Sequence, residues 1–259
     1  MAISINSLIR KTDRKPPRII VHGPPGVGKT TLLASLPRPV LIDAEGGLGL
    51  NDIPHFPLAT TFQDVKDAFG AAVEAGEFRT IIIDSLDHIE PLVWAETAQR
   101  NGWKTIEDAG YGKGYIAADE VWNEFLDYIN SATRDCDIAV AMTAHSIVKT
   151  FNDPEGQSYD RYEMKLHKRA NAVMQEKADL ILFANFEAIA SEIKDGTQKR
   201  TIGKGGGNRA LYAEKRPAFD AKNRHDLPAK VSMGRPFDWS VYAAAFPEGF
   251  FDNNEGVKK

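Results

Sequence analysis

The feature that most constrains this chain is the segment GPPGVGKT, from Gly23 to Thr30. It matches the phosphate-loop pattern G-x-x-x-x-G-K-[ST]. An apolar run at 18–21 precedes it and predicts a buried strand, while residues 30–36 follow it with the composition of a helix. A strand, a glycine-rich turn and a helix in this order aim backbone N–H groups and the positive end of a helix at one point. The segment therefore predicts a site for the polyphosphate of a nucleoside triphosphate.

Each residue type in this loop has an expected role. Glycines lack the Cβ that would keep the backbone away from phosphate oxygens, and prolines stiffen the loop and remove N–H groups. Lys29 is expected to place its charge at the β- and γ-phosphates, and Thr30 to offer its hydroxyl to Mg²⁺, which prefers oxygen ligands. The predicted ATP-binding residues are Gly23, Pro24, Pro25, Gly26, Val27, Gly28, Lys29, Thr30 and Thr31.

The bulk composition narrows the classes of function. Of the 259 residues, 42% are hydrophobic and 26% charged, as in ordinary soluble globular proteins. The formal net charge of -4 excludes a broadly cationic surface, so any nucleic-acid contact must come from a local patch. Cys136 is the only cysteine, which rules out an intramolecular disulfide and favours a reducing compartment. Because no apolar run approaches the ~20 residues of a membrane span and no secretory signal pattern is present, we expect a cytoplasmic protein without a membrane partner.

Strand-like and helix-like segments alternate along most of the chain. Short runs of Ile, Val and Leu predict buried strands, and apolar residues spaced three and four apart predict helices. The predicted segments after the first strand are strands at 39–43, 80–84, 137–143 and 179–185, and helices at 62–75, 89–100 and 117–132. This alternation predicts an α/β fold with a mostly parallel central sheet and helices on both faces.

The pattern changes after Phe186. Three segments alternate like short antiparallel strands, at 188–193, 199–202 and 209–213. Residues 241–246 predict a last short helix, and no low-complexity linker divides the chain. We therefore expect a polar lead-in at 1–17, a single domain at 18–250 with a C-terminal antiparallel extension, and a frayed tail at 251–259.

Asp84 ends the predicted strand at 80–84 and is followed by Ser85. In open parallel sheets, ligands lie at the carboxyl ends of the strands. A carboxylate at this position has the form of the Walker B acid, which holds Mg²⁺. The alternative is a strand-end aspartate that caps the next helix. Beside a phosphate loop the metal role is favoured, so Thr30 and Asp84 are the predicted Mg²⁺ residues.

Further polar groups follow the ends of two other predicted strands. Asp43 and Glu45 alternate after the second strand, so only one of them should face the nucleotide. We assign Glu45 as the general base that polarises the attacking water, and Asp43 as a support for its loop. The alternative is a solvated turn at 45–47. His145 follows the fourth strand and is predicted to sense the γ-phosphate and signal to the next loop, unless it is an ordinary surface histidine.

Together with the phosphate loop, four segments resemble the RecA-like branch of the P-loop ATPases. VLIDAEGG at 40–47 is similar to the RecA-family strand in which a glutamate activates water, and IIIDSLD at 81–87 to that family's Walker B strand. HSIVK begins at His145, where RecA relatives carry a glutamine that couples nucleotide to a DNA-binding loop. KADLILFAN at 177–185 is similar to the strand after that loop. The resemblance implies a RecA-like P-loop NTPase that binds ATP and Mg²⁺.

The segment AKNR at 221–224 resembles the Lys-Asn-Arg element of hexameric replicative helicases. Basic residues of that element reach the γ-phosphate of a neighbouring subunit, which implies catalytic roles in trans for Lys222 and Arg224 and a homo-oligomer with nucleotide at the subunit interface. The alternative is a solvated turn. The order of motifs from about Arg18 to Arg224 is similar to that of phage-encoded nucleotide-binding proteins, some of them core-only RecA-like single-strand annealing proteins. This implies the cytoplasm of a phage-infected or prophage-carrying bacterium.

Two segments are predicted to contact DNA. Residues 101–115 mix Trp and Tyr with Lys, and residues 146–177 are expected to form a long basic loop after the sensor. In RecA-like proteins, loops at these places line the DNA channel, where bases stack on aromatic rings and phosphates meet Lys and Arg. The alternative is core packing of the aromatic rings and a solvated helix face at 161–169. The predicted nucleic-acid residues are Trp103, Lys104, Lys113, Lys149, Arg161, Lys165, Lys168 and Arg169.

These patterns predict an ATP-hydrolysing protein that acts on single-stranded DNA in recombination or strand annealing. A single-strand-binding protein is a candidate partner. A helicase or helicase-loader motor is one alternative, and a nucleotide-dependent switch that binds a protein and no DNA is another. A small-molecule kinase is disfavoured because no lid with clustered arginines is evident.

Overall fold

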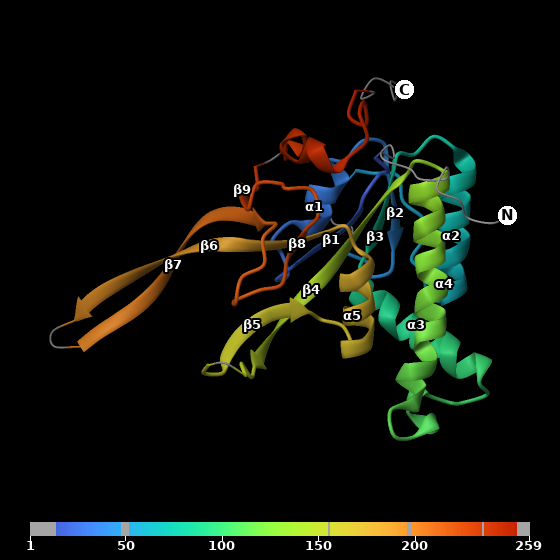
Figure 1. Ribbon diagram of the computed structural model, residues 1–259, viewed down its shortest axis with the longest axis horizontal. Coiled ribbons are helices and arrows are strands. Elements are labelled where there is room, and N and C mark those ends of the chain that lie inside the picture. The colour runs from blue at the N-terminus through green and yellow to red at the C-terminus, as the bar shows by residue number, and fades with distance from the viewer. Residues whose placement is uncertain (1–13, 48–51, 155, 196–197, 235, 253–259) are drawn as a thin grey trace, which may run out of the picture.

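The central feature of the molecule is one mixed β-sheet (Figure 1). A computed structural model describes residues 14–47, 52–154, 156–195, 198–234 and 236–252, without the side chains of 188–206. Most of the expected lead-in at 1–17 and tail at 251–259 lies outside the described residues. Across the described sheet the strands are β2 (Pro39–Asp43), β3 (Thr80–Asp84), β4 (Ala139–Phe151), β1 (Arg18–Gly23), β6 (Leu180–Asp195), β7 (Gln198–Tyr212) and β9 (Lys230–Ser232), with β5 (Tyr159–Met164) beside β4 and β8 (Lys222–Asn223) beside β6.

The strands from β2 to β6 in this order run parallel to one another. Their register places Asp43 beside Asp84, and Gly23 beside His145. Because parallel strands end at the same edge of a sheet, this edge collects the residues that were predicted to bind nucleotide.

Alternate side chains of these strands pack into two core layers. Ile20 and Ile81 belong to the layer under one set of helices, whereas Ile19 and Ile82 belong to the layer on the opposite face. The first layer is covered by α2 (Phe62–Ala75), α3 (Leu86–Arg100), η2 (Ile106–Ala109), α4 (Lys113–Asp135) and α5 (Lys168–Lys177), and the second by α1 (Lys29–Ala34) and η3 (Trp239–Ala245). The predicted α/β fold, with a mostly parallel sheet and helices on both faces, is confirmed. None of the described helices combines the length and apolar character that crossing a bilayer requires.

The C-terminal part adds antiparallel strands to one side of the sheet. β7 pairs with β6 along most of its length, and this β6–β7 hairpin extends as an arm well beyond the helices in Figure 1. β9 then pairs with β7, and β8 with β6. The expected antiparallel extension is present. The segments 188–193 and 199–202 are parts of two long strands, because β6 and β7 stay paired as far as Asp195 opposite Gln198.

The segment 146–177 is not the long loop that we expected. β4 continues through Phe151 and pairs antiparallel with β5, from Ser146 opposite Met164 to Phe151 opposite Tyr159. Helix α5 follows, with the His167 side chain accepting a hydrogen bond from the backbone of Arg169 at its start. The pairing satisfies the backbone polar groups that a loop would leave to water. The β4–β5 hairpin and α5 therefore leave the sheet edge next to His145.

Candidate nucleotide-binding site

The phosphate loop joins the end of β1 to the start of α1. Gly26 and Gly28 have φ of 72° and 96°, a left-handed conformation that favours glycine. Gly23 has a different reason to be glycine: a Cβ there would lie 2.2 Å from the carbonyl oxygen of Ala184 on β6. The packing of two neighbouring strands therefore requires glycine here, in addition to the predicted close approach of phosphate.

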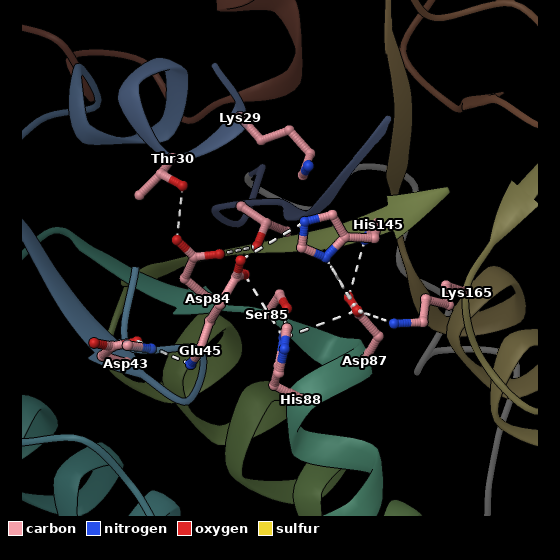
Figure 2. Close-up of polar contacts among 12 residues, drawn as sticks. Lys29, Thr30, Asp43, Glu45, Asp84, Ser85, Asp87, His88, His145 and Lys165 are labelled. Carbon is pink, nitrogen blue, oxygen red and sulfur yellow. Dashed lines mark hydrogen bonds and ion pairs between the residues drawn. The ribbon is translucent and has the colours of Figure 1, made fainter. Parts of the chain in front are cut away.

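Lys29 lies folded against its own loop. Its Nζ donates hydrogen bonds to the carbonyl oxygens of Gly23 at 3.2 Å and Pro24 at 3.3 Å, and the residue is only 7% exposed. Burial lowers the pKa of Lys29, and the nearby carboxylates of Asp84 and Glu45 oppose that shift. A buried ammonium that donates to backbone carbonyls is well suited to an anionic ligand. Figure 2 shows Lys29 near Thr30 and His145 at this edge of the sheet.

Asp84 is a buried carboxylate held by two hydroxyl groups. Thr30 Oγ1 donates to Asp84 Oδ2 at 2.7 Å, and the Thr143 hydroxyl donates a short hydrogen bond to Asp84 Oδ1. The residue is 6% exposed. The side chains of Thr30 and Asp84 offer only oxygen atoms as ligands. Mg²⁺ prefers oxygen ligands, so these two residues fit the expected ion. Sequence reasoning missed Thr143, although its place at the end of a buried strand was a usable signal.

Asp43 shapes the loop that carries Glu45. Asp43 Oδ1 accepts hydrogen bonds from the backbone of Glu45 at 2.9 Å and of Gly46 at 2.7 Å. This side-chain turn leaves the Glu45 carboxylate 30% exposed at the sheet edge, with Oε1 3.7 Å from His145 Nε2 and Oε2 3.6 Å from His88 Nδ1. The two histidines thus border the carboxylate that was predicted to be the base.

Asp87 is the buried partner of His145. Its Oδ1 accepts the backbone N–H of His145 at 2.9 Å, and its Oδ2 lies 3.0 Å from His145 Nδ1. Burial alone would raise the pKa of Asp87, but the hydrogen bonds from His145 hold it well below the ordinary value. Lys165 adds an ion pair at 3.7 Å, and its backbone N–H donates to the His145 carbonyl at 2.8 Å. Sequence reasoning missed Asp87, which lies in the first turn of α3 directly after the Walker B segment.

Glu90 lies one helical turn after Asp87, on the same face of α3. Its carboxylate accepts the backbone N–H of His167, with oxygens at 2.9 and 3.1 Å. Burial raises the pKa of Glu90 to about 7, against the hydrogen bond from His167. The ring of His167 stacks on Tyr115 with centroids 4.2 Å apart. One face of α3 therefore holds both His145 and the segment that leads into α5.

The predicted nucleic-acid residues fall into three groups. Lys104, Lys113 and Lys168 are exposed, and Trp103 is half-buried. Lys149 and Arg169 pair with acidic side chains, namely Glu163 at 3.6 Å for the lysine and Asp119 for the arginine. Lys165 is 58% exposed and pairs with Asp87 as described above.

Arg161 is the clear exception. Its side chain is 8% exposed and pairs with the buried carboxylate of Asp220 and, at 3.6 Å, with Glu163. Its guanidinium also lies over the ring of Phe151, 5.2 Å from the centroid. The assignment of Arg161 to nucleic-acid contact is wrong, because the side chain ties β5 to a distant segment and does not reach solvent.

Lys222 and Arg224 lie at the C-terminal end of α5. Lys222 Nζ donates to the carbonyl oxygens of Gln175 at 2.6 Å and Glu176 at 2.9 Å. Arg224 donates to the Glu176 carbonyl at 3.2 Å and pairs with Asp179 at 3.4 Å. These cations complement the negative end of a helix dipole within the subunit. The structure does not bring them to the phosphate loop of their own chain.

Comparisons with known proteins agree with this geometry. A family model described as AAA domain matches residues 15–225. Replication factor C subunit 4 of Encephalitozoon cuniculi (strain GB-M1) is 36% identical over 118 residues, which are 46% of this chain and 37% of that protein. The chain thus spans little more than a third of that relative. The phosphate loop and the family match identify a P-loop ATPase, and the chain belongs to the AAA domain family.

Proposed function

We propose that this P-loop ATPase uses Mg²⁺·ATP to act on single-stranded DNA, in recombination or strand annealing. The observation that carries the proposal is the path from the nucleotide edge to the β4–β5 hairpin and to helix α5, which begins with Lys168 and Arg169. His145 borders Glu45 on one side and is bonded to Asp87 on the other, and β5 ends beside it, with Met164 opposite Ser146. A change at the γ-phosphate position therefore has a direct mechanical route to β5 and α5.

The hydrolytic roles follow from the positions of the side chains. Thr30 and Asp84 would hold Mg²⁺, which neutralises charge on the phosphate oxygens. Lys29 stabilises charge that develops on the transferred phosphoryl group. Glu45, the partly exposed carboxylate of the edge, accepts a proton from the attacking water.

A cavity beside the phosphate loop suits the nucleoside. Its volume is about 400 Å³, within the range of ligand pockets. Gly28 and Thr31 line it on the loop side, and Phe237 adds an aromatic wall. Arg209 of β7 also lines it and donates to the Val27 carbonyl at 3.0 Å, so this strand fixes the loop next to the base. We assign the adenine and ribose to this cavity.

We propose that DNA contacts lysine amines on the side of the molecule where the path from the γ-phosphate position reaches α5. Lys104 and Lys113 flank η2, and Lys168 starts α5, which packs against α4. Tyr111 is completely exposed between these lysines, in reach of a base for stacking. Because the net charge of the chain is -4, such a local patch is required for any phosphate contact.

Assembly is part of the proposal. Lys222 and Arg224 would serve a neighbouring subunit's γ-phosphate after release from the end of α5, in a homo-oligomer with shared sites. The relative from Encephalitozoon cuniculi is by name one subunit of a replication factor, which supports a multi-subunit setting for a chain of this kind. A single-strand-binding protein is a further proposed partner.

ATP turnover with and without single-stranded DNA tests the function, measured at low and high salt. We expect DNA to raise the rate, and the stimulation to weaken steeply between about 50 and 200 mM salt because counterions compete for the phosphates. Lys113→Ala should reduce the stimulation. Arg134→Ala is the matched control, because this exposed arginine lies at the opposite end of α4 and forms an ion pair with Asp135.

Three outcomes distinguish the candidate functions. A rate that ignores DNA at both salt concentrations overturns the DNA proposal and favours a protein-binding switch. Stimulation by DNA together with unwinding of a forked duplex favours a helicase motor. Stimulation with annealing of complementary strands and no unwinding is the expected result.

A further inference from the structure

A cluster of two histidines and one carboxylate lies next to the Mg²⁺ residues. We propose that Glu45, His88 and His145 form a second cation site, suited to a transition-metal ion such as Zn²⁺. Filling this site occupies the carboxylate of Glu45 and stops hydrolysis. Binding of a metal ion at this cluster goes beyond the proposed function and does not depend on it. The inhibitory effect rests on the assignment of Glu45 as the base.

The distances in this cluster match a small coordination sphere. One ligand atom from each of the three residues lies within 4.8 Å of the other two. Glu45 Oε1 is 3.7 Å from His145 Nε2, and Oε2 is 3.6 Å from His88 Nδ1. Zinc bonds of about 2.0–2.2 Å in a tetrahedral site place ligand atoms about 3.4 Å apart. Small side-chain movements therefore convert this cluster into three ligands, with one position left for water or a phosphate oxygen.

The residues behind the cluster support the same conclusion. His145 Nδ1 lies 3.0 Å from the carboxylate of Asp87, whose side chain is 1% exposed. A carboxylate at Nδ1 holds the proton there, so Nε2 carries the lone pair and points toward Glu45. Metal-bound histidines usually donate their other ring N–H to a carboxylate, a backbone carbonyl or water, and Asp87 is such a partner. Ser85 Oγ lies 2.7 Å from His88 Nδ1, so an entering ion exchanges one hydrogen bond for a coordination bond.

The chemistry of the two neighbouring sites is different. Thr30 and Asp84 offer only oxygen, which suits Mg²⁺. Two imidazoles and a carboxylate suit zinc, copper or nickel, and bind Mg²⁺ poorly. The ligands come from three places that the fold brings together: Glu45 follows β2, His88 lies in the first turns of α3, and His145 lies in β4 (Figure 2). Excess Mg²⁺ should therefore leave the histidine cluster available.

Cobalt(II) is the probe of choice, because it replaces zinc and absorbs visible light when bound. We expect the full chain, in excess Mg²⁺, to bind one Co²⁺ with intense visible bands that Zn²⁺ abolishes. His88→Ala should lose these bands, and Asp87→Asn should weaken binding about 10–100-fold. His55→Ala is the matched control, since this histidine is exposed and away from the cluster, and it should titrate like the natural protein. Circular dichroism confirms folding of each variant.

Bands that persist unchanged in His88→Ala, or that never appear, overturn the site. Inhibition is then measured as the ratio of turnover with and without Zn²⁺. Zinc should inhibit the natural protein and His55→Ala strongly, and His88→Ala much less. Equal inhibition of all three places the zinc effect at the Thr30–Asp84 pair and overturns the regulatory step. If Glu45→Gln still hydrolyses ATP, the proposed base is wrong, while the cobalt titration continues to decide the metal site separately.

Discussion

Two carboxylates three residues apart, Asp84 and Asp87, organise two different neighbourhoods at the same sheet edge. Within the described residues, the carboxylate of Asp84 accepts hydrogen bonds from the hydroxyl groups of Thr30 and Thr143. Asp87 is held by an imidazole, a backbone N–H and a lysine. The first arrangement can give up its hydroxyl partner to a hard cation, whereas the second is already charge-balanced within the protein. From this contrast we propose that Asp84 serves the ligand and that Asp87 transmits its presence.

The largest expected effect is a loss of turnover. It tests the assigned base, Glu45, separately from Asp84 and Asp87. Glu45→Gln keeps the shape of the loop but removes the proton acceptor, so turnover should fall by about 10²–10⁴-fold with ATP binding retained. Single-turnover hydrolysis and calorimetric titration with ATP measure the two properties. Glu74→Gln on the exposed side of α2 is the control. Turnover near that of the control would move the base to another residue.

Lys29→Ala tests the phosphate-loop lysine, which lies next to the neighbourhoods of both Asp84 and Asp87. The buried ammonium faces Asp84 and Glu45, and its loss removes the cation expected at the β- and γ-phosphates. A reduction in turnover of about 10²–10³-fold is expected, with weaker ATP binding. A fluorescent ATP analogue reports the affinity. Undiminished affinity would mean that the backbone of the loop alone holds the triphosphate.

Asp84→Asn and Asp87→Asn separate the two neighbourhoods directly. The first should raise the Mg²⁺ concentration needed for half-maximal turnover by about 10-fold, because a ligand of the ion loses its charge. The second should leave that concentration unchanged and reduce the stimulation by DNA, since His145 loses its anionic partner. Magnesium titrations of both variants, with and without oligonucleotide, give the result. If both variants shift the Mg²⁺ requirement equally, the division between the carboxylates fails.

The sequence predicted well those elements whose signal is local. The strands at 39–43 and 80–84 and the helix at 62–75 begin and end where expected. Both strands are buried on two faces, and the helix starts at Thr61 with a capping box. The phosphate loop was equally readable, because its conformation depends on glycines within a few residues.

Features that depend on distant partners were missed. Arg161 reads as a surface cation, and only the fold shows that Asp220, 59 positions away, neutralises it in the interior. The β4–β5 hairpin was taken for a loop because its strands are half exposed and carry polar residues on both sides. Asp87 looks like an ordinary residue of a helix start until β4 places His145 against it.

The last prediction concerns the pH dependence of stability on the histidine side. Burial raises the pKa of Glu90 to about 7 in the folded chain, from 4.5 when exposed. Between these values the folded state binds more protons than the unfolded state. The stabilising contribution is thus complete below pH 4.5 and is lost as the pH rises through 7. Each unit of pKa difference corresponds to about 1.4 kcal/mol.

Glu90→Gln should match the natural protein in acid and exceed its unfolding free energy above pH 7. Urea midpoints measured across this range give the difference. His22, whose pKa burial lowers to about 4, produces the opposite slope between pH 4 and 6.5, but both proteins contain it and it cancels. A difference that stays constant with pH would show that folding does not shift the pKa of Glu90. Asp87 and Glu90 would then be two charged anchors on one face of α3, and the path to α5 would carry no proton.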